Sequence, residues 1–391
     1  SGVVLRGRGP DKTHLVFNSP NTIWYGAIRM SGSKSKRTVR VLGGSERGSR
    51  KLTVESTEGL KKGQTILISR DNIPAVMYTK PQWKASWDVR AVGQILRITA
   101  ISGKTIEIDT PLRLAYPKSL NPGFQILQPI ERAGIEDLHI KRLDKSEDDM
   151  IGINKALNCW IRNVESESCM KSHVLIFFGR FLTIEGSYFH HAYNYSGGHG
   201  YGVDVNKHTT DCLITNNIFH DLRHSMSVCL GANGNVFSYN YSFKNTLNDV
   251  CIHGHYSYMN LFEGNIVELV KYADWWGPTG PLTTCFRNRV ATEIVLYDHS
   301  HRATIVGNTI QRQIDTDSTS KDTFAEGNLI RSKMVWQKVA AGSRIPASLY
   351  LKAKPAFWGN RPWPGIGADV DAKGARMRLP AEDRYRELRR K

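Results

Sequence analysis

An asparagine recurs through the middle of the chain at nearly constant spacing, each time between two short apolar runs. Its positions are Asn163, Asn217, Asn240, Asn265, Asn288, Asn308 and Asn328, and Ser187 fills the same place in one repeat. Successive positions differ by 24, 30, 23, 25, 23, 20 and 20 residues. A short strand, a polar turn residue and another strand, repeated at this period, are what a solenoid of parallel β-coils requires.

The asparagine column has a structural interpretation. At a turn between parallel strands, asparagine tolerates the left-handed backbone conformation, and its side-chain amide can bond the next asparagine one coil along. We therefore predict a ladder that holds the coils in register, in preference to a row of ligand-binding amides. A second apolar run follows in each repeat, so one turn of about 20–25 residues forms one coil.

The period is interrupted near the N-terminus. Segments such as GQILRITAISGKTIEIDTPLRL alternate apolar and polar residues between turn signals, which predicts antiparallel hairpins. We predict an all-β protein, a right-handed parallel β-helix with an inserted antiparallel β-subdomain. The expected parts are a first coil (1–17), the inserted β-subdomain (18–130), the main β-helix (131–335), and a C-terminal capping segment with a basic tail (336–391).

The charge of the chain indicates the class of its partner. Its 53 lysines and arginines exceed its 36 acidic residues, for a net charge of +17. Such an excess favours a polyanion. Nucleic-acid-binding motifs are absent, and no apolar run reaches the roughly 18 residues of a membrane span. We therefore predict an acidic polysaccharide as the partner, with neither nucleic acid nor membrane, and leave the oligomeric state open.

The six cysteines show neither CxxC nor zinc-ligand spacing. Cys229 and Cys251 sit at matching places in consecutive repeats, so we expect them to stack in the coil wall. Buried free thiols are the favoured state. A bridge between these two cysteines is the alternative, because neighbouring strands approach disulfide range.

The coil repeat, its asparagine column and the opening segment GVVLRGRGPDKTHLVF resemble the pectate-lyase-like right-handed β-helix superfamily. The resemblance covers residues 1–17 and 130–331 and concerns the fold. The aspartate and RxPxxR patterns of pectate lyases are missing, and GHG at 198–200 lacks the other polygalacturonase elements. The resemblance implies an extracellular carbohydrate-active enzyme, secreted or periplasmic, without fixing its reaction. The chain opens within an apparent strand and turn, so we expect upstream sequence to have been removed.

Aligning the repeats brings the turns after the asparagine strands to one edge, about 4.8 Å apart in neighbouring coils. Nine of the 13 histidines lie between residues 173 and 255, and several fall on this edge. The candidate catalytic residues are Tyr195, His199, Arg223, His224, Asp249, Lys271 and Asp274. The candidate substrate-binding residues are His173, His191, Tyr193, Asp204, His253, His255, Trp275 and Trp276. Trp83 and Trp87, in the inserted region, are further candidates for a groove wall.

β-Elimination of a uronate polymer is the favoured reaction. His224 or His199 would remove the proton at C5, and Arg223 and Lys271 would neutralise the sugar carboxylate. One of the two tyrosines of the segment AYNYS would protonate the leaving oxygen.

Two other functions stay open. Asp249 and Asp274 lie at matching positions one coil apart and would form the carboxylate pair of a glycoside hydrolase. A non-catalytic carbohydrate-binding or structural β-helix is the second alternative. We predict no defined metal ligands and no certain cofactor. Calcium remains an alternative, because the two aspartates offer the oxygen ligands that it takes.

Overall fold

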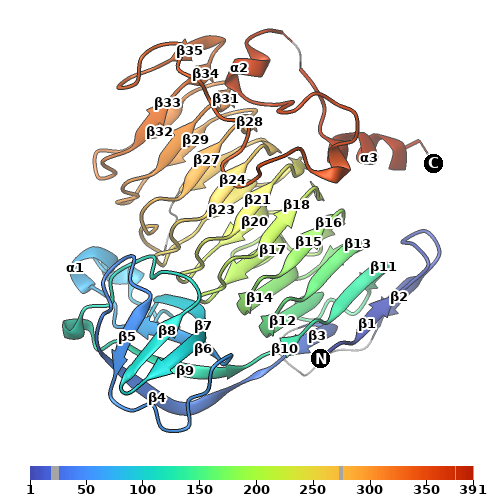
Figure 1. Cartoon of the computed structure of the whole chain (residues 1–391). Coiled ribbons are helices and arrows are strands. Elements are labelled where there is room, and N and C mark those ends of the chain that lie inside the picture. Colours follow the sequence, from blue (N-terminus) through green and yellow to red (C-terminus); the bar gives the residue numbers. More distant parts are fainter. Residues whose placement is uncertain (19–25, 273–275, 375, 391) are drawn as a thin grey trace.

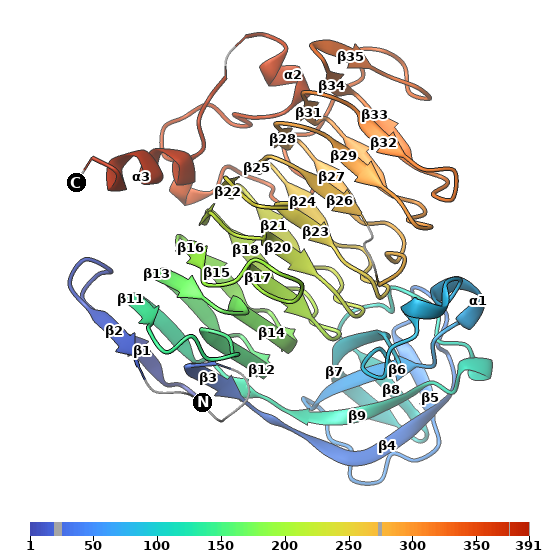
Figure 2. The same ribbon diagram turned by 180° about the vertical axis from the view of Figure 1, so that it is seen from behind.

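The computed structural model describes residues 1–18, 26–272, 276–374 and 376–390. Within them the chain winds into a right-handed parallel β-helix whose coils stack along one axis, and a small β-barrel lies beside the N-terminal coils (Figure 1). The view from behind shows the C-terminal segment running back along the outside of the coils (Figure 2). The predicted fold class is confirmed.

Each coil contributes strands to three faces, and the described residues form one sheet of 19 strands and another of 10. The larger sheet covers two faces, joined by β11 (Gly134–Arg142) and β13 (Trp160–Cys169). Its first face adds β1 (Val4–Arg6), β15 (Thr183–Glu185), β18 (Leu213–Thr215), β21 (Val236–Ser238), β24 (Leu261–Glu263), β27 (Thr284–Phe286), β30 (Thr304–Val306) and β33 (Phe324–Glu326). Its second face adds β2 (His14–Phe17), β16 (Tyr188–Ala192), β19 (Ile218–His220), β22 (Tyr241–Phe243), β25 (Ile266–Val267), β28 (Arg289–Val290), β31 (Thr309–Ile310), β34 (Asn328–Ile330) and β35 (Lys333–Val335).

The third face is the 10-stranded sheet, and it carries the site described below. Its strands are β10 (Ile130–Glu131), β3 (Ile28–Ser31), β12 (Ile151–Leu157), β14 (Ser172–Arg180), β17 (Tyr201–Asn206), β20 (His224–Val228), β23 (Val250–Ile252), β26 (Val270–Tyr272), β29 (Ile294–Leu296) and β32 (Ile314–Thr316). Inward-facing aliphatic and aromatic side chains of all three faces form one continuous core. Outward positions alternate with these core positions, so the face can present polar side chains without disturbing the core.

The asparagines form the predicted ladder. From Asn217 to Asn308, each Nδ2 donates to Oδ1 of the next ladder asparagine at 2.9–3.1 Å. Each backbone N–H donates to the same oxygen. Ser187 joins the ladder through its backbone N–H, which donates to Asn217 Oδ1 at 3.0 Å.

Two details of the ladder prediction are wrong. Asn163 lies one residue before the ladder position, because it is Val164 whose N–H donates to Ser187 Oγ. The left-handed residue is the one that precedes each ladder asparagine, as at Tyr239 (φ 55°) and Gly264 (φ 66°). The preceding residue therefore makes the bend, and the asparagine amide is left to bond along the helix axis.

We expect Asn265→Ala to destabilise the protein by about 3 kcal/mol, because each buried partner left unsatisfied costs about 1–3 kcal/mol. Asn265 is fully buried, its Oδ1 accepts two hydrogen bonds from Asn240, and its Nδ2 donates to Phe237 O. Asn163→Gly is the control, since the one hydrogen bond of this exposed side chain to the described residues is with Asp137, and glycine keeps the left-handed backbone. Urea unfolding measures both. Equal losses of unfolding free energy in the two variants would contradict a stabilising role for the ladder.

The inserted region forms a closed antiparallel barrel. Its strands are β4 (Ser33–Gly43), β5 (Lys51–Val54), β8 (Thr105–Ile108), β7 (Val92–Ser102), β6 (Thr65–Arg70) and β9 (Gly123–Gln128). The barrel has its own core. Between β6 and β7 the chain leaves the barrel through α1 (Pro74–Met77) and a 3₁₀ turn (Pro81–Trp83) and reaches the third face of the β-helix. A second 3₁₀ turn is Lys118–Leu120.

The C-terminal segment packs on the outside of the β-helix. It contains a 3₁₀ turn (Ala356–Trp358), α2 (Ala368–Asp371) and α3 (Pro380–Leu388). Tyr385 of α3 packs on Phe243 of the second face, with ring centroids 4.6 Å apart. None of the helices in the described ranges is long and apolar enough to cross a membrane.

All six cysteines are buried free thiols, as predicted. The predicted stacking of Cys229 on Cys251 is wrong. Cys251 pairs with Ser227 in the neighbouring strand, two residues earlier than Cys229. The alternative bridge between the two cysteines is therefore absent.

Candidate functional site

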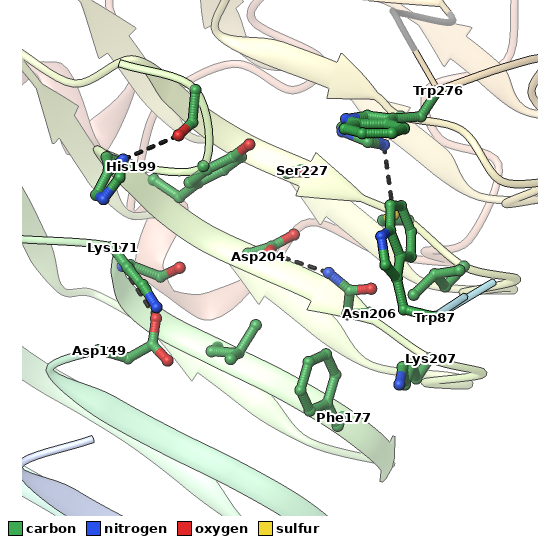
Figure 3. Close-up of a pocket in the computed structure, with 18 of the residues that line it drawn as sticks. Trp87, Asp149, Lys171, Phe177, His199, Asp204, Asn206, Lys207, Ser227 and Trp276 are labelled. Carbon is green, nitrogen blue, oxygen red and sulfur yellow. Dashed lines mark hydrogen bonds between the residues drawn. The ribbon is translucent and has the colours of Figure 1, made fainter. Parts of the chain in front are cut away.

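A cleft of about 940 Å³ opens on the outer face of the 10-stranded sheet. Strands β14, β17 and β20 form its floor. One wall comes from the turn segments at 147–149 and 197–199, and the other from Trp87 of the inserted region and Trp276 after β26. Figure 3 shows these walls on opposite sides, with Asp204 between them.

The alternating direction of side chains along each strand decides which residues face the cleft. On β17, Val203 and Val205 are buried in the core, so Asp204 and Asn206 face outward. Ser227 occupies the position of Asp204 one strand along, since the register pairs the two residues. The pattern GYGVDVN thus supplies both a core face and a polar floor.

Asp149 lies in the wall, just before β12, and is almost fully buried. Its Oδ1 accepts the Ser172 N–H at 3.0 Å, which leaves Oδ2 to carry a proton. Burial raises the pKa of Asp149 to about 7, and the charges of Asp148 and Asp204 contribute to the rise. A carboxyl group with this pKa is partly protonated at neutral pH and can act as a general acid.

Asp204 lies on the floor, where its Oδ2 accepts from Asn206 Nδ2 at 3.0 Å. Burial raises its pKa, and the charge of His253 acts in the opposite direction. Three buried floor atoms, Asp204 Oδ1, Asn206 Oδ1 and Ser227 Oγ, make no hydrogen bond of good geometry among the described residues, although Ser227 lies close enough to Asp204 to oppose the rise in its pKa. Native proteins seldom leave such atoms unpaired, so this floor is suited to a ligand rich in hydroxyl groups.

Further polar groups line the same cleft. His199 Nε2 lies 2.8 Å from Glu147 Oε2. Arg223 Nη1 donates to the Tyr201 hydroxyl at 3.2 Å, and burial raises the pKa of that hydroxyl well above its ordinary value. Lys171 contributes a positive charge near Asp149 and opposes the rise in that residue's pKa.

Two indoles form the aromatic wall. Trp87 and Trp276 meet edge to face, with ring centroids 5.3 Å apart. Trp87 is 39% exposed, so part of its apolar surface is available to a ligand, whereas Trp83 is buried. Ligand clefts are commonly lined by apolar and aromatic side chains, with a few polar groups that fix the orientation of the ligand.

The structure brings part of the predicted site together. His199, Asp204, His253 and Trp276 line the cleft. Arg223 reaches its rim through Tyr201. Asp274 and Trp275 lie outside the described residues.

Asp249 does not face the cleft. Its carboxylate is fully buried and accepts four hydrogen bonds: from Ser242 Oγ, Asn245 Nδ2 and the N–H groups of Glu268 and Leu269. Both oxygens are therefore occupied by protein donors. This leaves them unsuited to bind calcium, and among the described residues no group of three or more candidate ligands is arranged to hold a metal ion.

Two predicted histidines also point into the protein. His173 is buried between Ser166 Oγ (2.8 Å) and the carbonyl of His191 (3.1 Å). His255 contacts the Trp83 carbonyl at 2.6 Å and Asp88 at 3.4 Å. Both side chains help to hold the loops around the site, and neither lines the cleft.

The remaining candidates lie beside the cleft or away from it. The hydroxyl groups of Tyr193 and Tyr195 both donate to backbone carbonyls. His224 is buried, with Nδ1 3.1 Å from the Asn248 carbonyl. His191 belongs to the second face, next to His190. Lys271 lies on β26, beyond the strands of the cleft floor.

Sequence reasoning missed Asp149, Lys171 and Tyr201 as site residues. The segment SEDDM, an acidic run directly before the buried strand MIGIN, was a signal for Asp149. Lys171 belongs to one of the aligned turns, but nothing in the sequence distinguished it from other surface lysines. Tyr201 opens a strand and resembles a core residue by its pattern alone.

Comparisons with known proteins support the fold. No family model matches the sequence, and no curated protein matches it. The tailspike gp61 of Pseudomonas phage phi297 is similar in structure, with a TM-score of 0.53, 9% identity, and coverage of 84% of this chain and 61% of that one. This chain thus spans about three fifths of that tailspike. At this identity, the likeness concerns the fold alone.

Two further tailspikes are more distant. The gp49 tailspike of Pseudomonas phage LKA1 gives a TM-score of 0.49 at 13% identity, covering 80% of this chain and 50% of that one. The gp54 tailspike of Acinetobacter baumannii phage AP22, solved with an A. baumannii capsular saccharide, gives 0.36 at 13% identity, covering 84% and 70%.

Proposed function

We propose that the protein cleaves a polysaccharide by hydrolysis, with Asp149 as general acid and Asp204 as general base. The observation that carries the proposal is that a buried carboxyl group, Asp149, and a partly buried one, Asp204, both with raised pKa values, face one cleft. Asp149 would protonate the leaving glycosidic oxygen. Asp204 would take a proton from the water that attacks the anomeric carbon.

The separation of the two carboxylates favours inversion of configuration. Asp149 aligns with Ser172 and Tyr201 in successive strands, and Asp204 lies three residues beyond Tyr201. Two strand spacings and three residues each amount to roughly 10 Å, so the backbones lie about 14 Å apart. When the two side chains point toward each other across the cleft, their carboxyl groups still leave room for a water molecule. A retaining pair requires carboxyl groups about 5–5.5 Å apart.

The partner and location belong to the same proposal. The net charge of +17 supports an acidic polymer. The β-helix supports a protein related to the pectate-lyase-like superfamily that works outside the cell or in the periplasm. The unpaired floor atoms support binding through sugar hydroxyl groups.

β-Elimination is the second candidate, and one observation favours it. The Tyr201 hydroxyl, paired with Arg223, faces the same cleft as Lys171 and His199. These groups would supply an acid, a base and a cation for the uronate carboxylate. The carboxylates at 147–149 and Asp204 disfavour this reaction, because they would repel a uronate at the reacting sugar.

The products distinguish the functions. We expect incubation with a panel of acidic and neutral polysaccharides to release reducing ends without absorbance near roughly 235 nm, the signal of an unsaturated uronate. NMR of the first product should show the anomer opposite to that of the substrate. Absorbance growing with the reducing ends would establish a lyase. A polymer that binds and stays intact would identify a binding protein.

A further inference from the structure

Two lysines and a phenylalanine form a row at the end of the third-face strands, where the coil turns toward the barrel. Lys155, Phe178 and Lys207 occupy the same position in three successive coils, as the register of β12, β14 and β17 shows. All three have left-handed backbones, with φ of 55°, 54° and 35°. The shared turn therefore brings these side chains out at matching places, one strand spacing apart.

The barrel adds a third lysine to this row. Lys34 Nζ lies 5.6 Å from the ring centroid of Phe178, and Lys155 Nζ lies 5.8 Å from the same centroid. Lys207 Nζ lies 5.5 Å from the ring of Phe177. Each of the three ammonium groups therefore lies within cation–π distance of a phenylalanine ring.

The described residues offer these three lysines no acidic partner. In the described part of the chain, no carboxylate lies within ion-pair distance of Lys34, Lys155 or Lys207. Their polar contacts are neutral amides: Gln125 for Lys34 and Asn154 for Lys155. Burial lowers the pKa of both Lys155 and Lys207, and the charge of Lys34 lowers both further. An anion held among the three would relieve this repulsion.

The row continues the cleft. Lys207 and Phe177 line it, at the side away from Asp149 and His199 (Figure 3). Six residues of strand, roughly 20 Å, separate Asp149 from Lys155. The distance between the acidic end and the basic end of the cleft is therefore greater than the length of one sugar unit.

We propose that Lys34, Lys155 and Lys207 form an anion-binding subsite that takes an acidic substituent of the polymer, a carboxylate, sulfate or phosphate. The inference rests on the proposed function for the nature of the polymer. It places the charged sugar at the barrel end and an uncharged sugar at Asp149 and Asp204. The substrate is then a mixed polymer in which an acidic unit follows the bond that is cleaved.

The test is binding, measured by affinity electrophoresis with polygalacturonate, dextran sulfate and uncharged dextran. We expect Lys155→Gln/Lys207→Gln to weaken binding of one or both charged polymers about tenfold and to leave dextran unchanged. The loss should shrink in high salt, which screens the lysines of the wild type. Comparison of the two charged polymers separates carboxylate from sulfate recognition.

The matched control is Lys61→Gln/Lys62→Gln, which removes the same charge from exposed positions on the barrel. It should change binding less than twofold. Equal losses in the two double variants, or no loss in the first, would overturn the subsite. Reducing ends are measured separately. A protein that binds through Lys155 and Lys207 without cleaving would refute hydrolysis and retain the subsite.

Discussion

Asp149→Asn is expected to lower kcat/KM by about 10³ on the polysaccharide that the panel identifies, since general acid catalysis contributes about 10²–10⁴. The asparagine Oδ1 can still accept the Ser172 N–H, so the wall keeps its shape while the transferable proton is lost. The fold should be at least as stable as the wild type at neutral pH, because asparagine carries no buried charge there. Initial rates and a thermal melt on the same preparation measure both.

The pH dependence provides a second readout of the same group. Because burial raises the pKa of Asp149 to about 7, wild-type kcat/KM should fall as pH rises through about 7, where the acid loses its proton. The residual activity of Asp149→Asn should lack this alkaline limb. The stability of the fold should also depend on pH. Because the folded state raises the pKa of Asp149, its contribution to wild-type stability is lost as pH rises through 7. The free energy of unfolding of Asp149→Asn, relative to that of the wild type, should therefore increase between pH 4 and 8.

Asp315→Asn is the control for Asp149. It lies on β32 of the same sheet, outside the cleft, and the substitution is the same exchange of a carboxyl group for an amide. Unchanged activity in both variants would remove Asp149 from the mechanism. A loss restricted to Asp149→Asn but with the alkaline limb intact would make it a binding residue.

The sequence was sufficient for the fold because the repeat encodes it locally. Each coil repeats a strand, a bend and an asparagine, and the amide of that asparagine can reach only its neighbours along the axis. Errors appear where the period is ambiguous by one residue. Asn163 stands in the bend, and Val164 stands in the ladder, although the segment WIRNVES suggested the reverse.

The site was harder to predict because side-chain direction is not periodic in turns. Alignment correctly brought His199 to the edge of the third face, but it could not tell that Asp249 points inward. Asp204 was predictable from strand alternation, since it stands between two core valines. Trp87 was a candidate for a groove wall, but it reaches the cleft from about 120 residues away in sequence, through a tertiary contact that no local pattern contains, and the same reasoning also named the buried Trp83.

Asp249→Ala is expected to destabilise the protein by about 3–5 kcal/mol, because each buried donor left without its acceptor costs about 1–3 kcal/mol. The substitution deletes the acceptor of four hydrogen bonds, two of them from the backbone N–H groups of Glu268 and Leu269 in the next coil. It would leave Ser242 and Asn245 as buried donors without that acceptor. Thermal and urea unfolding measure the loss.

The same variant separates a structural from a catalytic Asp249. At a temperature where the variant remains folded, activity per folded molecule should stay within a fewfold of the wild type, because the carboxylate does not line the cleft. Asp249→Asn should be intermediate in stability, since it keeps one acceptor oxygen and turns an amide donor toward other donors. If Asp249→Ala melts near the wild-type temperature yet has no activity, Asp249 belongs to the reaction, as its place in the aligned turns first suggested.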